Sequence, residues 1–348
     1  MVEKIDSGVA EKFLEIVGRN SDILIVSHIN PDGDAVGSVV AMQSYLEFKG
    51  KKAKIVLPGE YPQYLSLLDS NKSIIVYGRE ADYAESLLRE ADLIIVLDLN
   101  RLDRIDKMQS IVAGSRSIKI LIDHHPQPVE EEFDLLISDE TVSSTCELLF
   151  WLFCKCERIL SGGGKVSHFP LDMAKALYVG VMTDTNNFSN SVSDSTFRMA
   201  SELLGMGIDK EELQHLVFGG FSEERMRLMG YMLLNKMVIL PEYKAGYMIL
   251  TLEEQRMCRY EEGDSEGFVN LPLGIRGIEI SALFTEKRDM VKVSFRSSNE
   301  FSVNKFAREF FNGGGHERAS GGKLFMKIEE VPAYFEAKLS ESLKRDLR

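Results

Sequence analysis

The chain has 348 residues, of which 44% are hydrophobic and 27% are charged, a composition typical of a globular protein with about two domains. Its formal net charge of −13 argues against extended binding to duplex nucleic acid, because that binding usually needs a basic stripe. The N-terminal residues form no apolar leader, and no stretch approaches the ~20 apolar residues of a membrane span. We therefore expect a cytoplasmic protein that does not contact membranes.

The charge is unevenly distributed along the chain. Residues 287–348 carry a net charge of +4, which leaves −17 for the rest. An acidic body that handles an anion needs metal ions, and the basic C-terminal part could contact the far end of that anion.

The first predicted strand, over 23–27, ends in three potential ligands. His28, Asp32 and Asp34 lie in a Pro/Gly turn, and the glycine between the two aspartates allows a tight backbone in which their carboxylates converge. A helix over 39–48 follows, and a strand, loop and helix N-terminus form a natural pocket for an anion. By itself the segment fits a plain turn after a strand-end histidine equally well.

Further short apolar runs, bounded by turn residues and separated by helical stretches, lie at 53–57, 73–77, 92–97 and 118–122. Strands that are apolar throughout and alternate with helices indicate a parallel α/β sheet that is buried on both faces. In such sheets ligands bind beyond the carboxyl ends of the strands. The polar residues that follow the strands should therefore lie on one rim.

Two of these strands end in candidate ligands, Asp98 and the triplet Asp123, His124 and His125. A lone aspartate such as Asp98 is more often a helix cap or a turn residue. A carboxylate and two histidines directly after an apolar strand are costly without partners, which favours a functional site.

Asp184 follows a helix predicted over 171–182. A carboxylate is unfavourable at the C-terminal end of a helix, and a bound cation would remove that penalty. The alternative is a solvent-exposed aspartate in a polar turn.

Gly219 and Gly220 mark a predicted domain boundary. In the strands predicted after it, apolar and polar residues alternate, as they do in half-exposed strands. We expect a parallel-sheet α/β domain over 1–218, a helical linker over 219–236 and a smaller α+β domain over 237–348, with a cleft between the two domains.

A glycine-rich segment lies in the second predicted domain, where three glycines precede a histidine. Their backbone N–H groups could form a concavity that binds an anion beside the imidazole, and Arg296 favours this interpretation. The alternative is a flexible turn before a strand over 323–326. The residues concerned are Gly313, Gly314, Gly315 and His316.

The chain resembles the DHH phosphoesterase superfamily, and most closely its nanoRNase/pAp phosphatase branch, whose C-terminal domain carries a Gly-Gly-Gly-His motif. The resemblance covers nearly the whole chain. It rests on five motifs in the same order: His28-x-x-x-Asp32-x-Asp34, Asp98, Asp123-His124-His125, Asp184 and Gly-Gly-Gly-His316-x-x-Ala319-x-Gly.

This resemblance implies a centre of two metal ions, usually Mn²⁺, with Mg²⁺ or Co²⁺ as possible substitutes. Sites rich in carboxylates with two imidazoles suit Mn²⁺, and two such ions can stabilise a displacement at phosphorus. The implied ligands are His28 and Asp32 for one ion, Asp34, His124 and Asp184 for the other, and Asp98 as the bridge.

The resemblance also assigns the neighbours of these ligands. Asp123 would support the site, and His125 matches a histidine that contacts the scissile phosphate or assists the leaving group. Arg296 and the segment from Gly313 to His316 match positions that hold the rest of a nucleotide. After Asp184, many members continue Thr/Ser-Gly-x-Phe, whereas this chain has Asn186 at the glycine position, which leaves substrate preference open.

The resemblance predicts metal-dependent hydrolysis of short oligoribonucleotides to mononucleotides, of 3′-phosphoadenosine 5′-phosphate (pAp) to AMP, or of both. One alternative is a phosphodiesterase for linear or cyclic di-adenylates, and another is a catalytically silent nucleotide-binding module, which the intact ligand set disfavours. Pyrophosphatases of the superfamily lack the Gly-Gly-Gly-His motif, and this acidic chain shows no basic groove for long single strands. We expect short single-stranded RNA or a small nucleotide as the partner, and a homodimer is possible.

Overall fold

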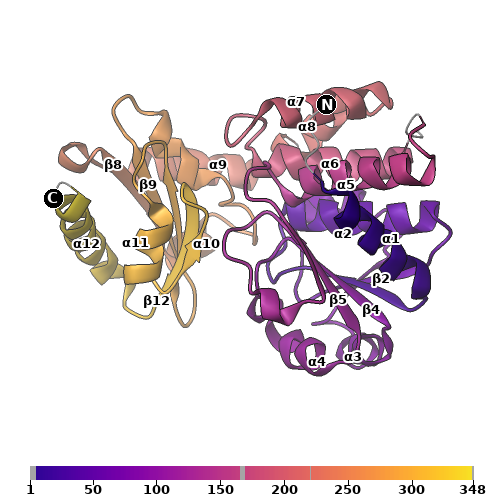
Figure 1. The fold of residues 1–348 in the computed structure, drawn as a ribbon. Helices are drawn as coiled ribbons and strands as arrows, with labels where there is room; N and C mark the ends of the chain where they lie inside the picture. Colours follow the sequence, from indigo (N-terminus) through magenta and orange to yellow (C-terminus); the bar gives the residue numbers. More distant parts are fainter. Residues whose placement is uncertain (1–4, 165–168, 220, 347–348) are drawn as a thin grey trace. The chain divides into compact units, whose positions relative to one another are not determined.

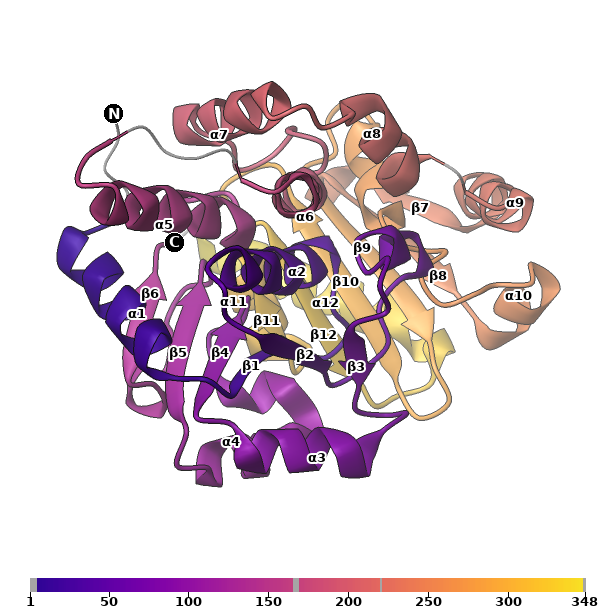
Figure 2. The same cartoon turned by 90° about the vertical axis from the view of Figure 1, so that its right-hand side faces the viewer.

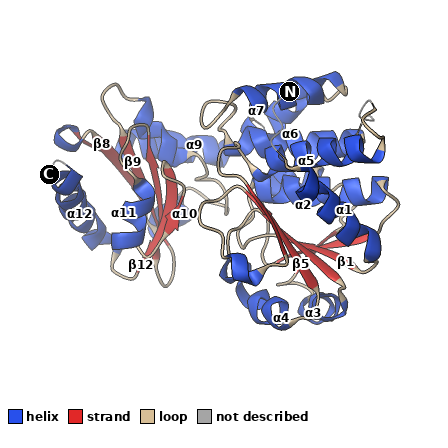
Figure 3. Ribbon diagram, viewed as in Figure 1, coloured by secondary structure: helices blue, strands red, loops and turns tan. Residues whose placement is uncertain are grey.

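The structure is a computed structural model that describes residues 5–164, 169–219 and 221–346. It divides into two compact units, residues 1–220 and 221–348, each built on one sheet with helices around it (Figure 1; Figure 3). Gly220, one of the two glycines expected at the boundary, lies outside the described residues. No helix of the described residues combines the length and the apolar character needed to cross a membrane.

The first unit contains a six-stranded, all-parallel sheet with the order β3-β2-β1-β4-β5-β6 (Figure 2). The sequence pattern predicted every strand of this sheet except β6. The strands are β1 (Ile23–Val26), β2 (Ala53–Leu57), β3 (Ile74–Val76), β4 (Leu93–Leu97), β5 (Ile118–Asp123) and β6 (Leu135–Ser138). The helices are α1 (Ser7–Arg19), α2 (Gly33–Phe48), α3 (Ala81–Glu90), α4 (Gln109–Gly114), α5 (Thr145–Leu160), α6 (Leu171–Asp184), α7 (Asp194–Gly205) and α8 (Lys210–Phe218).

Helices cover both faces of this sheet, which explains why its strands are apolar throughout. Ile23 and Ile25 of β1 belong to the core that includes α1, α2, α5 and α6, whereas Leu24 and Val26 belong to the core that includes α3 and α4. Alternate side chains of one strand therefore enter two different cores. The predicted fold class, a parallel-sheet α/β domain followed by a smaller domain, is confirmed.

Helix α2 begins at Gly33, six residues earlier than the predicted start at Val39. The carboxylate of Asp32 accepts hydrogen bonds from the amides of Asp34 and Ala35, each at 3.1 Å, and so caps the helix. The polar cluster that suggested a long turn is thus a helix N-terminus. Asp34 stands in the first turn of α2, and its side chain is held by a regular element.

Helices α2 and α6 pack closely because glycines line their crossing. A Cβ atom at Gly37 would lie 2.6 Å from the carbonyl oxygen of Ala176, and one at Gly180 would lie 2.8 Å from Oδ1 of Asp34. This close crossing brings the start of α2 near the last turn of α6, where Asp184 stands.

Hydrogen bonds to the side chain of Glu147 connect the start of α5 with the start of α7. Its fully buried carboxylate accepts five hydrogen bonds, from the amide and hydroxyl of Ser143, the hydroxyls of Ser195 and Thr196, and the indole of Trp151. Burial alone would raise the pKa of Glu147, but the hydrogen bonds from Ser143, Ser195 and Thr196 outweigh it and hold the pKa below its ordinary value.

The second unit contains a mixed sheet with the order β11-β12-β10-β9-β8-β7, in which β8 and β9 are parallel and the other neighbours antiparallel. The strands are β7 (Met237–Leu240), β8 (Ala245–Leu250), β9 (Ile280–Glu286), β10 (Val291–Ser297), β11 (Gly314–Gly315) and β12 (Ala319–Leu324). The helices are α9 (Glu223–Tyr231), α10 (Leu252–Met257), α11 (Val303–Phe310) and α12 (Val331–Asp346).

Helices pack on both faces of this second sheet as well. One core includes α11 and α12, and the other includes Leu228 of α9 and Met232 of the π-turn Met232–Lys236, together with Met248 and Leu283 of the sheet. The helical part of the segment predicted as a linker therefore packs within the second unit.

Within the glycine-rich segment, Gly314 and Gly315 form the short strand β11, which pairs with β12. The strand predicted over 323–326 is β12, and it begins earlier, at Ala319. The amide of Gly313 donates to the carbonyl of Ala307, and the amide of His316 donates to the carbonyl of Ala319. A Cβ atom at Gly313 would lie 1.9 Å from the carbonyl oxygen of Gly321. Close backbone packing thus accounts for this glycine, and these two amides are engaged within the unit.

We predict that Gly37→Ala lowers the stability of the first unit by about 1–3 kcal/mol, because the new methyl group overpacks the α2–α6 crossing. Thermal unfolding in a chelating buffer measures the loss. Gly18→Ala in α1 is the matched control, since its methyl group would enter open space, and it should be neutral or slightly stabilising. Equal effects of the two variants would contradict the packing argument.

We predict that Glu147→Gln destabilises the protein by about 2–3 kcal/mol at pH 7, because hydrogen bonds to a buried carboxylate are lost. A lowered folded-state pKa stabilises the fold above the unfolded-state pKa of about 4.3, and this stabilisation is lost as the pH falls through the folded-state value. The difference between wild type and variant should therefore shrink below about pH 4. Urea unfolding between pH 7 and pH 3.5 measures it, and a constant difference would contradict the assignment.

Candidate metal centre

The carboxyl ends of three adjacent strands bring most of the predicted ligands to one rim. β1, β4 and β5 lie near one another in the sheet and run in the same direction. His28 lies two residues beyond β1, Asp98 directly follows β4, and His124 directly follows β5. Asp34 reaches the same place from the first turn of α2, and Asp184 reaches it from the last residue of α6.

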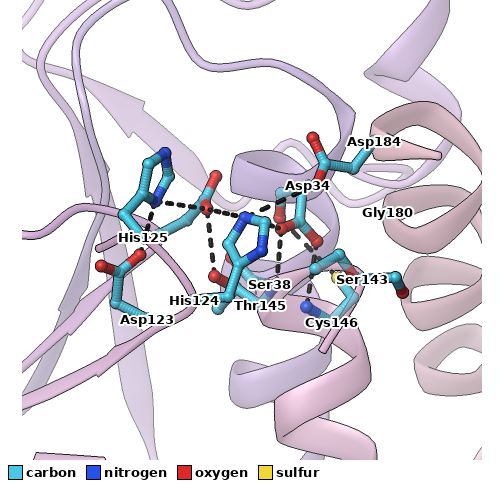
Figure 4. Close-up of polar contacts among 12 residues, drawn as sticks. Asp34, Ser38, Asp123, His124, His125, Ser143, Thr145, Cys146, Gly180 and Asp184 are labelled. Carbon is cyan, nitrogen blue, oxygen red and sulfur yellow. Dashed lines mark hydrogen bonds and ion pairs between the residues drawn. The ribbon is translucent and has the colours of Figure 1, made fainter. Parts of the chain in front are cut away.

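His124 lies at the middle of this cluster (Figure 4). Its Nε2 atom is 3.5 Å from Oδ2 of Asp184, 3.8 Å from Oδ1 of Asp98 and 3.9 Å from Oδ2 of Asp34. The other oxygen of Asp98, Oδ2, is 3.4 Å from Nε2 of His28. Oδ1 of Asp98 therefore faces His124 and also lies 3.7 Å from Nδ1 of His125, whereas Oδ2 faces His28.

Three groups of potential ligand atoms share Asp98: one joins it to Asp123 and His125, and the other two consist of residues that the resemblance names as ligands. Of these two, one consists of His28, Asp32 and Asp98, the other of Asp34, Asp98 and His124, and the ligand atoms of each group lie within 4.8 Å of one another. All six residues that the resemblance names as ligands thus stand in this cluster, with Asp184 beside His124. Their ligation of metal stays a prediction.

The cluster concentrates negative charge in a buried place. Asp34 and Asp98 are 1% and 2% exposed. Burial, followed by the charges of Asp98, Asp184 and Asp32, raises the pKa of Asp34 well above its ordinary value. Burial also acts to raise the pKa of Asp98, but the hydrogen bond from His28 and the nearby histidine charges outweigh it and lower that pKa.

The donor set fits divalent cations. Cations placed among these carboxylates would favour the ionised form of Asp34, which the bare cluster disfavours. Imidazole nitrogens combined with carboxylate oxygens suit first-row divalent ions, Mn²⁺ among them.

Backbone conformation along the rim is unusual. Asn30, Asp98 and Gln127, which follow β1, β4 and β5, all have φ near +58° (57°, 59° and 58°). Non-glycine residues seldom adopt this left-handed conformation, and such strain gathers at functional sites.

His125 lies between a carboxylate and a guanidinium. Its Nδ1 atom is 2.7 Å from Oδ1 of Asp123, and its Nε2 atom is 3.2 Å from Nη1 of Arg104. A carboxylate only accepts and a guanidinium only donates, so the proton of His125 sits on Nδ1 and Nε2 accepts from Arg104. Asp123 is completely buried, and its Oδ2 has no hydrogen-bond partner among the described residues.

Sequence reasoning missed Arg104 and Thr145, which contact the site. Arg104 lies in the 3-10 turn Leu102–Met108, and nothing in that polar segment distinguishes it from a solvent-exposed arginine. Thr145 is the first residue of α5, and its hydroxyl donates to Asp98 at 3.0 Å. The Ser-Ser-Thr run before an apolar helix was the available signal.

The chain departs from the family pattern at a residue with a left-handed backbone. Asn186, Asn187 and Phe188 have φ values of 48°, 57° and 60°. Thr185 supports this turn, because its hydroxyl accepts from the amide of Phe188 and donates to the carbonyl of Val181. Asparagine tolerates this conformation better than most residues, so Asn186 meets the backbone requirement that a glycine would meet.

The predicted nucleotide contacts lie together in the second unit. Arg296 on β10 pairs with Ala319 on β12, whose neighbour Ser320 pairs with Gly315 on β11. The guanidinium of Arg296 donates to the carbonyl of Phe295 at 2.9 Å. Binding of nucleotide by these residues stays a prediction.

Comparison with known proteins gives two family matches. The model of the DHH family, N-terminal domain, matches residues 22–181, and the model of the DHHA1 domain matches residues 254–341. Four of the five motifs lie inside these two ranges, and Asp184 lies just beyond the end of the first.

Similar proteins cover nearly the whole chain. The bifunctional oligoribonuclease and PAP phosphatase NrnA of Bacillus subtilis is 28% identical over 321 residues, 90% of this chain and 93% of that protein. The cyclic-di-AMP phosphodiesterase PdeA of Listeria monocytogenes is 23% identical over 88% of this chain, which spans only 45% of that protein. The crystal structure of an exopolyphosphatase-related protein from Bacteroides fragilis matches with a TM-score of 0.89 and 40% identity over 97% of both chains.

The family predicted from the motifs is thus confirmed by two independent domain matches and by relatives that cover most of the chain. The chain belongs to the DHH family of phosphoesterases and carries a DHHA1 domain in its second unit.

Proposed function

We propose that this protein is a divalent-metal-dependent hydrolase that releases mononucleotides from short oligoribonucleotides and AMP from pAp. The observation that carries the proposal is the placement of Asp98, whose two oxygens face His28 and His124 and which belongs to both ligand groups. The relative of this chain from Bacillus subtilis, which is named as both an oligoribonuclease and a PAP phosphatase, supports the choice of substrates.

In this proposal His28 and Asp32 would hold one ion, Asp34, His124 and Asp184 would hold the other, and Asp98 would serve both. Bound there, two Mn²⁺ ions would supply charge stabilisation at phosphorus and a water molecule that ionises near neutral pH. The protein would contribute ligands of which four, His28, Asp34, Asp98 and His124, are buried, and ligands placed before substrate arrives lower the cost of reorganisation during the reaction.

His125 is the residue that we assign to the scissile phosphate or the leaving group. Asp123 fixes its ring and keeps its proton on Nδ1, while Arg104 occupies Nε2. For Nε2 to contact a phosphate oxygen, the hydrogen bond with Arg104 must open, and both groups can then donate to the same anion once His125 is protonated. We further propose that Arg296 and the Gly313–His316 segment bind the rest of the nucleotide.

The second candidate function is hydrolysis of di-adenylate signals. The similarity to the cyclic-di-AMP phosphodiesterase of Listeria monocytogenes favours it, although that protein is about twice as long as the matched region. The name of the Bacteroides fragilis relative adds inorganic polyphosphate to the substrates that must be compared.

We predict that Asp98→Asn weakens Mn²⁺ binding and reduces hydrolysis of a dinucleotide by more than about 100-fold, because even supporting residues of metal sites are worth 10–100-fold. Equilibrium dialysis and product release by chromatography measure the two effects. Asp103→Asn is the matched control, because Asp103 is half exposed and pairs with Arg101 outside both ligand groups. Near-wild-type turnover by Asp98→Asn would sink the proposed role.

A product time course with Mn²⁺ ranks the substrates. We predict the fastest release of mononucleotides from di- to pentaribonucleotides, cleavage of pAp to AMP, slower attack on linear or cyclic di-AMP, and loss of all activity after treatment with EDTA. Preference for a di-adenylate or for polyphosphate would replace the proposed substrates. Nucleotide binding that survives EDTA, without turnover on any substrate, would show a binding module instead.

A further inference from the structure

The N-terminus of α5 contacts two of the predicted ligands at once (Figure 4). The amides of Thr145 and Cys146 donate to the two oxygens of Asp34 at 2.7 and 3.0 Å, and the hydroxyl of Thr145 donates to Oδ1 of Asp98 at 3.0 Å. A single residue thus binds both carboxylates, one through its backbone and one through its side chain.

The hydroxyl of Thr145 determines how Asp98 can turn. Oδ1 of Asp98 receives this hydrogen bond and lies 3.8 Å from Nε2 of His124, which leaves Oδ2 directed at His28. Rotation of the carboxylate would break the bond. Thr145 is completely buried, so water cannot easily replace a missing donor, and the loss of the hydroxyl would leave this oxygen of Asp98 without that donor.

The position of Thr145 is itself fixed by its neighbours. The hydroxyl of Ser144 caps α5 by accepting from the amide of Glu147, and the carboxylate of Glu147 holds the amide and hydroxyl of Ser143. Thr145 therefore follows a turn whose backbone is held by hydrogen bonds. These bonds limit its motion relative to the carboxylates of Asp34 and Asp98.

We propose that Thr145 is a positioning residue of the metal centre, whose hydroxyl orients Asp98 so that one oxygen serves each metal position. Its amide, together with that of Cys146, holds Asp34 at the neighbouring position. The inference rests on the proposed function only in taking Asp34 and Asp98 as metal ligands. It requires no particular substrate.

The test compares Thr145→Val, which removes the hydroxyl and keeps the shape, with Thr145→Ser, which keeps the hydroxyl. We expect the valine variant to bind Mn²⁺ 10–100-fold more weakly than wild type and the serine variant to bind it within about threefold of wild type. Free Mn²⁺, measured by its electron paramagnetic resonance signal during titration of the apoprotein without substrate, gives the affinities and the number of ions bound.

Ser281→Ala in the second unit is the matched control, because it also removes a completely buried hydroxyl, one that donates to the carbonyl of Val269. It should lower the thermal midpoint without changing Mn²⁺ affinity. If Thr145→Val does not fold, Thr145→Ala carries the same expectation. Wild-type Mn²⁺ affinity in a folded variant without the hydroxyl, or equal weakening by valine and serine, would overturn the inference.

The outcomes separate this inference from the proposed function. Wild-type protein that binds Mn²⁺ at the expected affinity but cleaves none of the phosphoesters would refute the proposed hydrolysis and leave the role of Thr145 standing. If wild-type protein cleaves the phosphoesters but Thr145→Val binds Mn²⁺ as tightly as wild type, the proposed hydrolysis stands and the role of Thr145 is refuted.

Discussion

The first unit depends on how it accommodates several carboxylates that lie within a few ångströms of one another and away from water. Like charges at this separation repel strongly in a medium of low dielectric, and burial together with these neighbouring charges raises the pKa of Asp34. Hydrogen-bond donors relieve part of it, namely the amides at the start of α5, which donate to Asp34, and the imidazole of His28, which donates to Asp98. Divalent cations bound among the carboxylates would offset the remaining repulsion.

The fold supplies the geometry from elements that are rigid for other reasons. Parallel strands buried on both faces end at one rim, so ligands from β1, β4 and β5 meet without a long loop. The crossing of α2 and α6, which glycines keep close, adds Asp34 and Asp184 from two helices. Buried Glu147 then anchors the turn before α5, and Thr145 in that helix connects to Asp98.

Much of this could be predicted from the sequence, because apolar periodicity identifies buried strands and the residues that follow parallel strands must share a rim. The five predicted strands and the clustering of His28, Asp98 and His124 follow from that logic, whereas the family was predicted from its resemblance in five motifs. The start of α2 was placed wrongly, because Asp32 in a Pro/Gly context reads as a turn when it is a helix cap. The glycine-rich segment was predicted to be an anion-binding concavity, with a flexible turn as the alternative, and neither interpretation anticipated that its glycines allow two backbones to pack closely.

Contacts between distant segments could not be predicted from local patterns. The bonds from Thr145 to Asp34 and Asp98 join residues more than 40 positions apart, and the contact between Arg104 and His125 links a polar turn to a strand end. Threonine at a helix start and arginine in a turn are common in any protein. Only the folded arrangement gives them a place beside the ligands.

The central claim is that two metal ions share Asp98 as a ligand. Anomalous diffraction from crystals soaked in Mn²⁺, recorded near the manganese absorption edge, tests this most directly. We predict two anomalous peaks, one on each side of Asp98 and about 3.5–4 Å apart. One peak should lie nearer His28 and the other nearer His124. A single peak, or peaks that do not flank Asp98, would contradict the claim.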